Sequence, residues 1–133
     1  MCIRDRLYHV SDPAAALEFL SRVCGGLLLV ETVVGPGDAT DREAINPTTE
    51  DPSLLVCGTS GRGCRPSRAW FHARLCELFE YVYTPLTQPN HYLYPVDWTQ
   101  TSPFTRRAMF VASRTRLDNP QLSLELLDRQ VRH

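Results

Sequence analysis

Residues 7–32 read LYHVSDPAAALEFLSRVCGGLLLVET, and this stretch decides the fold. Ser11 or Asp12 can cap the free amide groups at the start of a helix, and the proline that follows suits the first turn. Apolar side chains then recur at the spacing of a helix that packs on a sheet, until the two glycines at 25–26 end it. The wholly apolar run at 27–30 is typical of a strand covered on both faces. Helix and strand together indicate half of a parallel α/β unit.

The rest of the chain supplies further elements of the same kind. Ser67 can cap a second helix, whose apolar face consists of Phe71, Leu75, Leu78 and Phe79. Residues 81–84 and 108–112 are apolar runs that predict two more strands. A short helix is expected within residues 119–127, where Asn-Pro precedes three leucines at helical spacing.

Two long connections separate these elements, at residues 35–69 and 88–106. Both contain many prolines and other turn-forming residues, and the second is also rich in aromatic residues. A structureless loop of this length is unusual inside a compact domain. We therefore expect the first connection to be partly ordered, to carry function and to be the first place for substrate contacts.

Composition and charge exclude several classes of protein. The chain has 133 residues, of which 43% are hydrophobic and 22% charged, as in one folded domain and unlike a disordered chain. Its net charge of -1 provides no basic field that would attract nucleic acid or an anionic membrane. No apolar stretch is long enough to span a bilayer, so we expect no membrane partner and a cytoplasmic location. Five cysteines without a Cys-x-x-Cys pair favour reduced thiols.

Polar side chains beside the strand predicted at 27–30 are candidates for a site. Glu31 and Thr32 follow this strand directly, and His9 lies just before the capped helix, at the expected carboxyl edge of a preceding strand. Ligands of open α/β sheets bind at that edge, where an acid, a hydroxyl or an imidazole can contact a polar substrate. There is also a purely structural interpretation. His9 can be a solvated loop histidine, and Glu31 and Thr32 can be hydrated or cap a helix. The sequence leaves both interpretations open.

The conceivable metal ligands are Cys57, Cys64, His72, Cys76 and His91. His72 and Cys76 lie one helical turn apart on the same face, as two ligands of one metal would. The spacing from Cys57 to Cys64 is wrong for a zinc knuckle, however, and Cys76 can be a small apolar residue beside the core. We therefore expect no metal, and a small zinc-stabilised domain remains an alternative.

Aromatic and arginine side chains alternate in the second half of the chain. The set comprises Trp70, Tyr92, Tyr94, Trp98, Arg65, Arg68, Arg106 and Arg107. Such side chains could stack on and pair with a base or nucleotide. The slightly negative net charge favours the other interpretation, in which the aromatics seal a long loop over the sheet.

The segment at 7–13, the alanine- and leucine-rich helix after it and the run at 26–32 resemble the second half of class I S-adenosylmethionine-dependent methyltransferases. In that family a leucine-tyrosine-histidine segment follows the fourth strand, and the fourth helix and fifth strand come next. The resemblance continues downstream, where residues 65–70 would open the next helix. Residues 81–84 and 107–113 would then be strands six and seven, which pair antiparallel in that fold.

The resemblance implies a fold class and a cofactor. The fold would be α/β, a truncated Rossmann-like methyltransferase sheet whose strands are equivalent to five, six and seven, with flanking helices. The cofactor would be S-adenosylmethionine, close to Leu7, Tyr8 and His9. The acceptor would be a small molecule or a nucleic-acid base, in a pocket lined by residues among His9, Glu31, Thr32, Arg68 and Trp70. The resemblance assigns no catalytic base.

Two features that bind the cofactor in this family have no counterpart in the sequence, namely the glycine-rich first loop and the acidic residue on the ribose. Both would lie upstream of Leu7, and residues 1–6 have the character of a non-native leader. We therefore expect residues 7–133 to be the carboxyl-terminal portion of a single methyltransferase domain, inactive and unable to bind the cofactor alone. The alternative is a noncatalytic α/β module whose two long connections hold a ligand or partner.

Overall fold

The structure is a computed structural model that describes residues 1–133 except 37–40, 52, 55–60 and 101–104. Its elements, in chain order, are β1 (Cys2–Arg4), the 3-10 turn η1 (Leu7–His9), α1 (Pro13–Val23), β2 (Leu27–Val34), β3 (Pro47–Thr49), β4 (Arg62–Cys64), α2 (Arg68–Leu78), β5 (Tyr81–Pro85), β6 (Thr87–Gln88), β7 (Arg106–Ser113), β8 (Leu122–Ser123) and β9 (Val131–Arg132). The described residues contain no helix with the length and apolar character that crossing a membrane requires.

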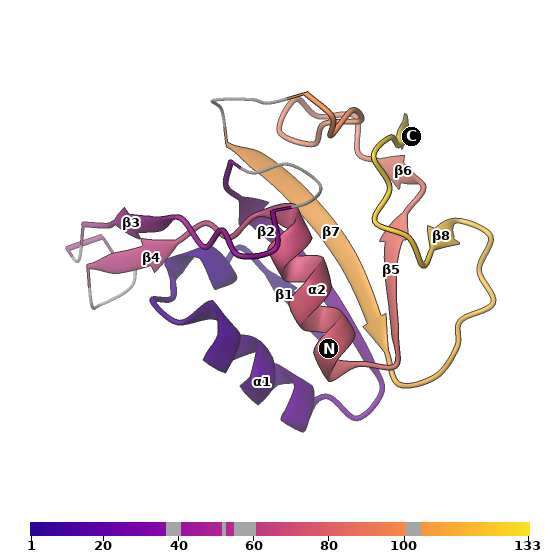
Figure 1. Cartoon of the computed structure of the whole chain (residues 1–133), viewed down its shortest axis with the longest axis horizontal. Coiled ribbons are helices and arrows are strands. Elements are labelled where there is room, and N and C mark those ends of the chain that lie inside the picture. Colours follow the sequence, from indigo (N-terminus) through magenta and orange to yellow (C-terminus); the bar gives the residue numbers. More distant parts are fainter. Residues whose placement is uncertain (37–40, 52, 55–60, 101–104) are drawn as a thin grey trace.

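The central sheet has five strands in the order β1-β2-β7-β5-β8 (Figure 1). β1 and β2 are parallel and joined through α1, which confirms the predicted parallel α/β unit. β5 and β7 pair antiparallel, as the resemblance implied for the two strands at those positions. The α/β class is therefore confirmed, in a sheet of mixed direction.

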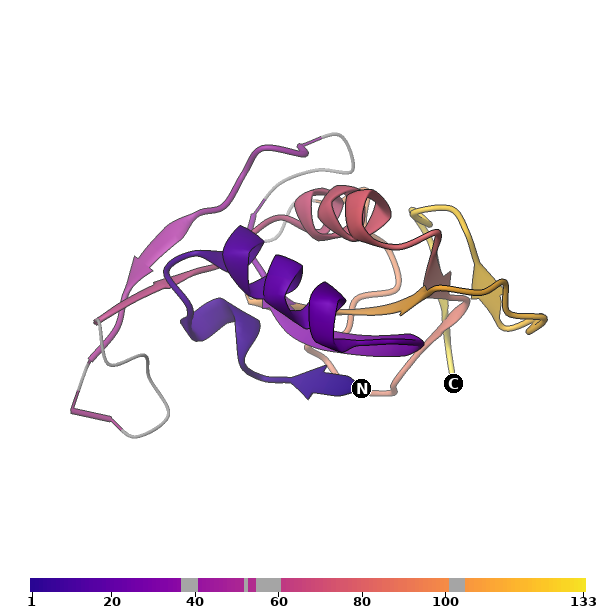
Figure 2. The same ribbon diagram turned by 90° about the horizontal axis from the view of Figure 1, so that it is seen from below.

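Both helices begin where the sequence predicted, because both caps form. The Asp12 carboxylate accepts a hydrogen bond of 2.9 Å from the amide of Ala15, and Ser67 Oγ accepts one of 3.0 Å from the amide of Trp70. α1 and α2 cover the same face of the sheet (Figure 2). Between them and the sheet lies the core, which includes Leu17, Leu28, Val30, Phe71, Leu75 and Phe110.

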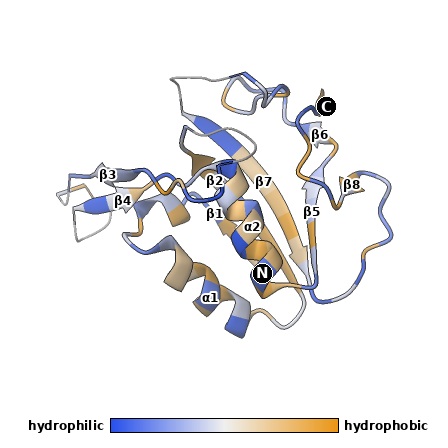
Figure 3. Ribbon diagram, viewed as in Figure 1, coloured by the Kyte–Doolittle hydropathy of each residue, from blue (hydrophilic) through white to orange (hydrophobic). Residues whose placement is uncertain are grey.

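The other face of the sheet has no helix over it among the described residues (Figure 2). Leu29, Val111 and Tyr83 form one row across this face, because Leu29 pairs with Val111 in the β2–β7 register and Tyr83 pairs with Val111 in the β5–β7 register. Leu29 is 40% exposed. β7 is hydrophilic where it begins and mostly hydrophobic after that (Figure 3).

The strand predicted at 27–30 is longer than expected and continues to Val34. The reason is pairing, since each residue of β2 has a partner on β7, from Leu27 opposite Ser113 to Val34 opposite Arg106. Glu31 and Thr32 therefore lie within the strand, and the expectation that they directly follow its end is corrected.

The sheet also contains two strands that the sequence did not predict, β1 and β8. β1 lies within residues 1–6, the segment that we had set aside as a leader, and the origin of that segment stays a prediction.

The helix predicted within residues 119–127 is wrong, because β8 lies there and pairs with β5. Two carbonyl groups of this segment accept hydrogen bonds from side chains that are distant in the sequence. Thr84 donates to the carbonyl of Glu125 at 2.6 Å and Arg68 donates to that of Leu127 at 2.7 Å. Tertiary contacts thus override the local helical spacing.

Candidate functional site

The clearest arrangement of reactive groups is a pair formed by His9 and Glu50. η1 follows β1 directly and carries His9, whose Nδ1 lies 2.7 Å from Oε1 of Glu50. The two side chains are only 16% and 11% exposed. A carboxylate can only accept a hydrogen bond, so a proton on Nδ1 would be donated to Glu50, and in that tautomer Nε2 carries the lone pair.

The hairpin of β3 and β4 brings Glu50 to His9. Glu50 directly follows β3, and β4 packs against η1 at Gly63. A Cβ atom on Gly63 would lie 2.5 Å from the carbonyl oxygen of Tyr8 and 2.7 Å from Oε1 of Glu50. No side chain fits there, so glycine is what permits this close approach. The first long connection is thus partly ordered, as expected.

A cluster of charged and phenolic side chains lies beside the pair, centred on Glu31. Arg107 Nη1 lies 2.5 Å from Oε1 of Glu31 and also pairs with Asp5. The hydroxyl of Tyr94 donates to the same Glu31 oxygen at 2.8 Å, and Arg4 Nε lies 3.3 Å from the other. The cluster holds the Glu31 carboxylate between two guanidinium groups.

These contacts shift the titration of two of the groups. Burial lowers the pKa of Arg107, but its hydrogen bonds and ion pairs with Glu31 and Asp5 outweigh that, so the pKa lies above its ordinary value. Burial raises the pKa of Tyr94, and the hydrogen bond to Glu31 raises it further. Arg107 is therefore a permanent cation, and Tyr94 is a neutral hydrogen-bond donor at physiological pH.

Two cavities with shared walls open at these groups. The first, about 510 Å³, is lined by Arg4, Asp5, Arg6, Tyr8, His9 and Arg107. The second, about 630 Å³, is lined by Arg4, Glu31, Pro89, His91, Leu93, Tyr94, Arg107 and Met109. His9 and Glu31 are thus candidates that the fold brings to neighbouring cavities, in the size range of small-molecule sites.

Thr32, Arg68 and Trp70 lie elsewhere, and none of them lines either cavity. Thr32 points to the helix-covered face, since neighbouring strand residues alternate, and it is fully buried. The Arg68 guanidinium stacks 4.3 Å from the centre of the Trp98 ring, and burial lowers the pKa of Arg68 to about 10. Trp70 is buried and packs edge-on against Phe71.

Of the three residues of η1 predicted to lie near the cofactor, two line a cavity and one does not. Tyr8 lines the first cavity with His9, and their ring centres are 4.1 Å apart. Leu7 is buried in the core. Tyr8 and His9 are therefore the η1 side chains that a ligand in this cavity would meet.

Sequence reasoning missed Glu50, which contributes most to the geometry at His9. It lies 41 residues from His9 in the chain, in a segment without periodicity, so no local signal marks it. Arg107 was noted among the arginines near aromatic residues, without a role at Glu31. Its position opposite Val33 in the β2–β7 register is what places it on the same face as Glu31.

The described residues contain no group of three or more side chains that could hold a metal ion. Sγ of Cys76 lies 3.8 Å from Nδ1 of His72, so these two do form a neighbouring pair on α2. Cys57 lies outside the described residues.

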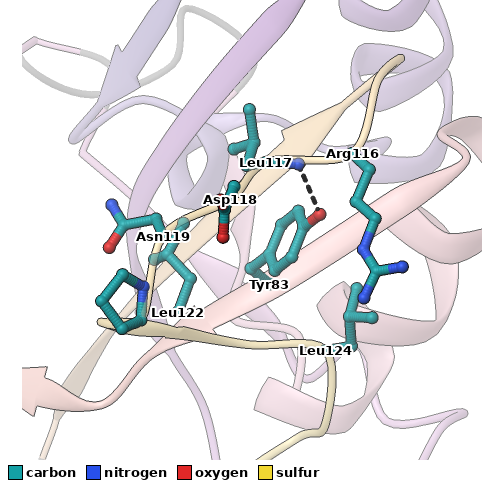
Figure 4. Close-up of a pocket in the computed structure, with 8 residues that line it drawn as sticks. Tyr83, Arg116, Leu117, Asp118, Asn119, Leu122 and Leu124 are labelled. Carbon is teal, nitrogen blue, oxygen red and sulfur yellow. Dashed lines mark hydrogen bonds between the residues drawn. The ribbon is translucent and has the colours of Figure 1, made fainter.

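A third cavity, about 560 Å³, lies over β5 and the segment after β7 (Figure 4). Tyr83 borders it, and the Tyr83 hydroxyl accepts a hydrogen bond of 2.9 Å from the amide of Leu117. The remaining lining residues are Arg116, Asp118, Asn119, Pro120, Leu122 and Leu124. None of the sequence candidates is among them.

Comparison with known proteins shows which solved structures share this fold. No protein-family model and no curated protein matches the chain. Two crystal structures of the N-terminal domain of EvdMO1 match it in fold, each with a TM-score of 0.60 and 21% sequence identity. One was determined in the presence of SAH (S-adenosylhomocysteine) and D-fucose, and the other with SAH bound. The chain shares their fold. The match covers 84% of this chain but only 45% and 44% of those chains, so this chain spans less than half of their length.

Proposed function

We propose that this chain is the carboxyl-terminal portion of an S-adenosylmethionine-dependent methyltransferase. The observation that carries the proposal is its shared fold with a domain that binds SAH, over 84% of the chain. SAH is what S-adenosylmethionine becomes once its methyl group has been transferred. A domain that binds SAH is therefore equipped for the product of methyl transfer, and this chain would contribute its second half.

The strand order supports the same proposal. In the class I methyltransferase sheet that the sequence resembles, β2, β5 and β7 would take the places of strands five, six and seven. β1 immediately precedes the Leu7–His9 turn and occupies the position where strand four would lie, whether or not its own residues are those of the natural protein. It is parallel to β2, as adjacent strands at those positions would be.

The two cavities at His9 and Glu31 are where we place methyl transfer. Ligands of open α/β sheets bind at the carboxyl ends of the strands, and η1 begins at the carboxyl end of β1. Tyr8 and His9 would face the cofactor or the acceptor, and Glu31 and Arg107 would bind polar groups of the acceptor. Methyl transfer depends mainly on holding the acceptor in line with the methyl group, which a rigid ion-pair cluster favours.

Two observations favour a small hydroxyl-bearing acceptor over a nucleic-acid base. The EvdMO1 domain was crystallised with D-fucose, a small sugar. The net charge of -1 also gives this chain no general attraction for nucleic acid.

The test is to read the source gene upstream of the codon for Leu7 and to express the protein with the residues encoded there. In calorimetric titrations, we expect this longer protein to bind SAH stoichiometrically with micromolar affinity, and we expect the 133-residue chain to give no binding heat. Micromolar, stoichiometric binding to the 133-residue chain would refute the idea that it holds only part of the cofactor site. No binding by the longer protein would favour a noncatalytic ligand-binding module instead.

A further inference from the structure

We propose that His9, positioned by Glu50, is the base that takes the proton from a hydroxyl group of the acceptor. This inference rests on the proposed methyltransferase function and goes beyond it, because it names the proton acceptor and restricts the acceptor to hydroxyl compounds. The contact that carries it is the one between His9 Nδ1 and Glu50 Oε1, at 2.7 Å.

The geometry leaves one ring nitrogen of His9 for chemistry. In the proposed tautomer Nδ1–H donates a hydrogen bond to Glu50, so the lone pair of the neutral ring is on Nε2. Both side chains are mostly buried, so the ring is held in place, yet His9 lines the cavity of about 510 Å³. A base must be within hydrogen-bond reach of the proton that it removes, and a hydroxyl in this cavity can meet that condition.

The carboxylates near the cavity are poorer candidates for the base. Arg107 contacts both Glu31 and Asp5, and Glu31 also accepts from Tyr94. The oxygens of these two carboxylates are thus already in contact with a guanidinium group or a phenol. The contact of His9 with Glu50, by contrast, is made through Nδ1 and does not involve Nε2.

The contact between His9 and Glu50 involves no side chain of residues 1–6. His9 and Glu50 are brought together by η1 and by the hairpin of β3 and β4, with Gly63 at their contact. The His9–Glu50 contact therefore uses none of the first six residues, whereas Arg4, Asp5 and Arg6 line the cavity beside His9.

The proposed step balances in atoms and charge. The acceptor oxygen forms a bond to the methyl carbon of S-adenosylmethionine while the carbon–sulfur bond breaks. The electron pair of the broken carbon–sulfur bond stays on sulfur. The sulfonium becomes the neutral thioether of SAH. The hydroxyl proton passes to Nε2 of His9, and the positive charge moves from sulfur to the imidazolium beside Glu50.

The first experiment measures the tautomer of His9 in the protein as its gene encodes it, by long-range proton–nitrogen NMR correlation. We expect the neutral ring to carry its proton on Nδ1 in the wild type. Glu50→Gln should retain this tautomer, because its amide oxygen still accepts, whereas Glu50→Ala should lose it. A proton on Nε2 in the wild type would overturn the proposal.

The second experiment measures turnover of the same protein with radiolabelled S-adenosylmethionine and three probe acceptors, D-fucose, L-rhamnose and D-glucosamine. We expect label on hydroxyl oxygen. His9→Gln should lower kcat by roughly a hundredfold or more, as for a lost general base, and leave the Kd for SAH within about threefold. Glu50→Ala should lower kcat roughly tenfold, with Glu50→Gln between it and the wild type. His133→Gln is the matched control, since His133 lies outside both cavities, and should be unaffected.

The outcomes separate this inference from the proposed function. A protein that does not bind SAH contradicts the proposed function, and the tautomer measurement still decides the role of Glu50. A protein that binds SAH but labels only the amine of D-glucosamine, labels none of the probes, or retains its kcat after His9→Gln contradicts the inference alone.

Discussion

Glu31 shows how one buried acid organises the residues around it. Its carboxylate accepts from Tyr94 and pairs with Arg107 and Arg4, although these residues are distant in the sequence. Such a group is costly to bury alone, and its partners provide the charge and hydrogen bonds that offset the loss of water. The rigidity of this cluster suits a surface that must hold a substrate in one orientation.

Glu31→Gln should lower the pKa of Tyr94. Burial raises that pKa first, and the hydrogen bond and charge of Glu31 raise it further, while Arg107 lowers it. Removal of the negative charge leaves Arg107 beside the phenol, so the anion becomes easier to form. The measurement is alkaline titration of tyrosine absorbance, with Glu31→Gln/Tyr94→Phe to identify the contribution of Tyr94.

The sign of the pH dependence follows from the same shift. A phenol whose pKa is raised in the folded protein contributes stability below its unfolded pKa of about 10 and loses it as the pH rises through the folded value. Alkaline destabilisation should therefore begin near pH 10 and should be smaller in Tyr94→Phe. An unchanged Tyr94 titration in Glu31→Gln would contradict the assigned hydrogen bond.

At the scale of elements, the hairpin of β3 and β4 has a positional role. It is too short to be stable alone, with three residues in each strand. It packs against η1 instead, and that contact holds Glu50 at His9. An irregular connection thereby provides a buried charge to a site on the sheet edge.

Gly63→Ala should separate the hairpin from η1. The new Cβ would lie 2.5 Å from the Tyr8 carbonyl oxygen, so the backbone must move, at a cost of about 1–3 kcal/mol in the free energy of unfolding. The measurement is urea denaturation. Gly26→Ala is the matched control, because nothing lies within 4 Å of its Cβ position and its stability should change little. Equal stability losses in the two variants would contradict the close contact at Gly63.

The start of α1 is a second prediction at this scale. Asp12→Ala should lower the free energy of unfolding by about 1 kcal/mol, because the amide of Ala15 loses its side-chain acceptor. Asp12→Asn should stay within a few tenths of the wild type, since asparagine caps equally well. Thermal unfolding measures both, and a loss as large in Asp12→Asn as in Asp12→Ala would show that charge, and not capping, is what matters.

For the whole molecule, the main feature is the uneven cover of the sheet. α1 and α2 lie on one face (Figure 2), while Leu29, which is 40% exposed, and the half-buried Val111 lie on the other. Exposed apolar surface of this kind promotes association. The 133-residue chain should therefore be poorly stable or aggregate when prepared alone.

Charges placed on this face should reduce the association. We expect Leu29→Lys/Val111→Glu to increase the monomeric fraction in size-exclusion chromatography with light scattering, because these two positions lie opposite each other and the charges can pair. Phe19→Lys changes an exposed apolar residue of α1 and is the control, with little expected effect. A wild-type chain that is fully monomeric and does not bind a hydrophobic dye would contradict the prediction.

The sequence by itself determined the elements whose signals are local. The caps at Asp12 and Ser67 and the apolar runs of β2, β5 and β7 each lie within a few residues, and the corresponding helices and strands form where they predict. Tertiary structure decided what depends on distant partners. Pairing with β7 extends β2 to Val34, and pairing with β5 makes residues 122–123 a strand where a helix was predicted. The hairpin of β3 and β4 brings Glu50 to His9. The physical reason is that a hydrogen bond or ion pair across 41 residues leaves no periodic trace in the chain, whereas a cap or an apolar run does.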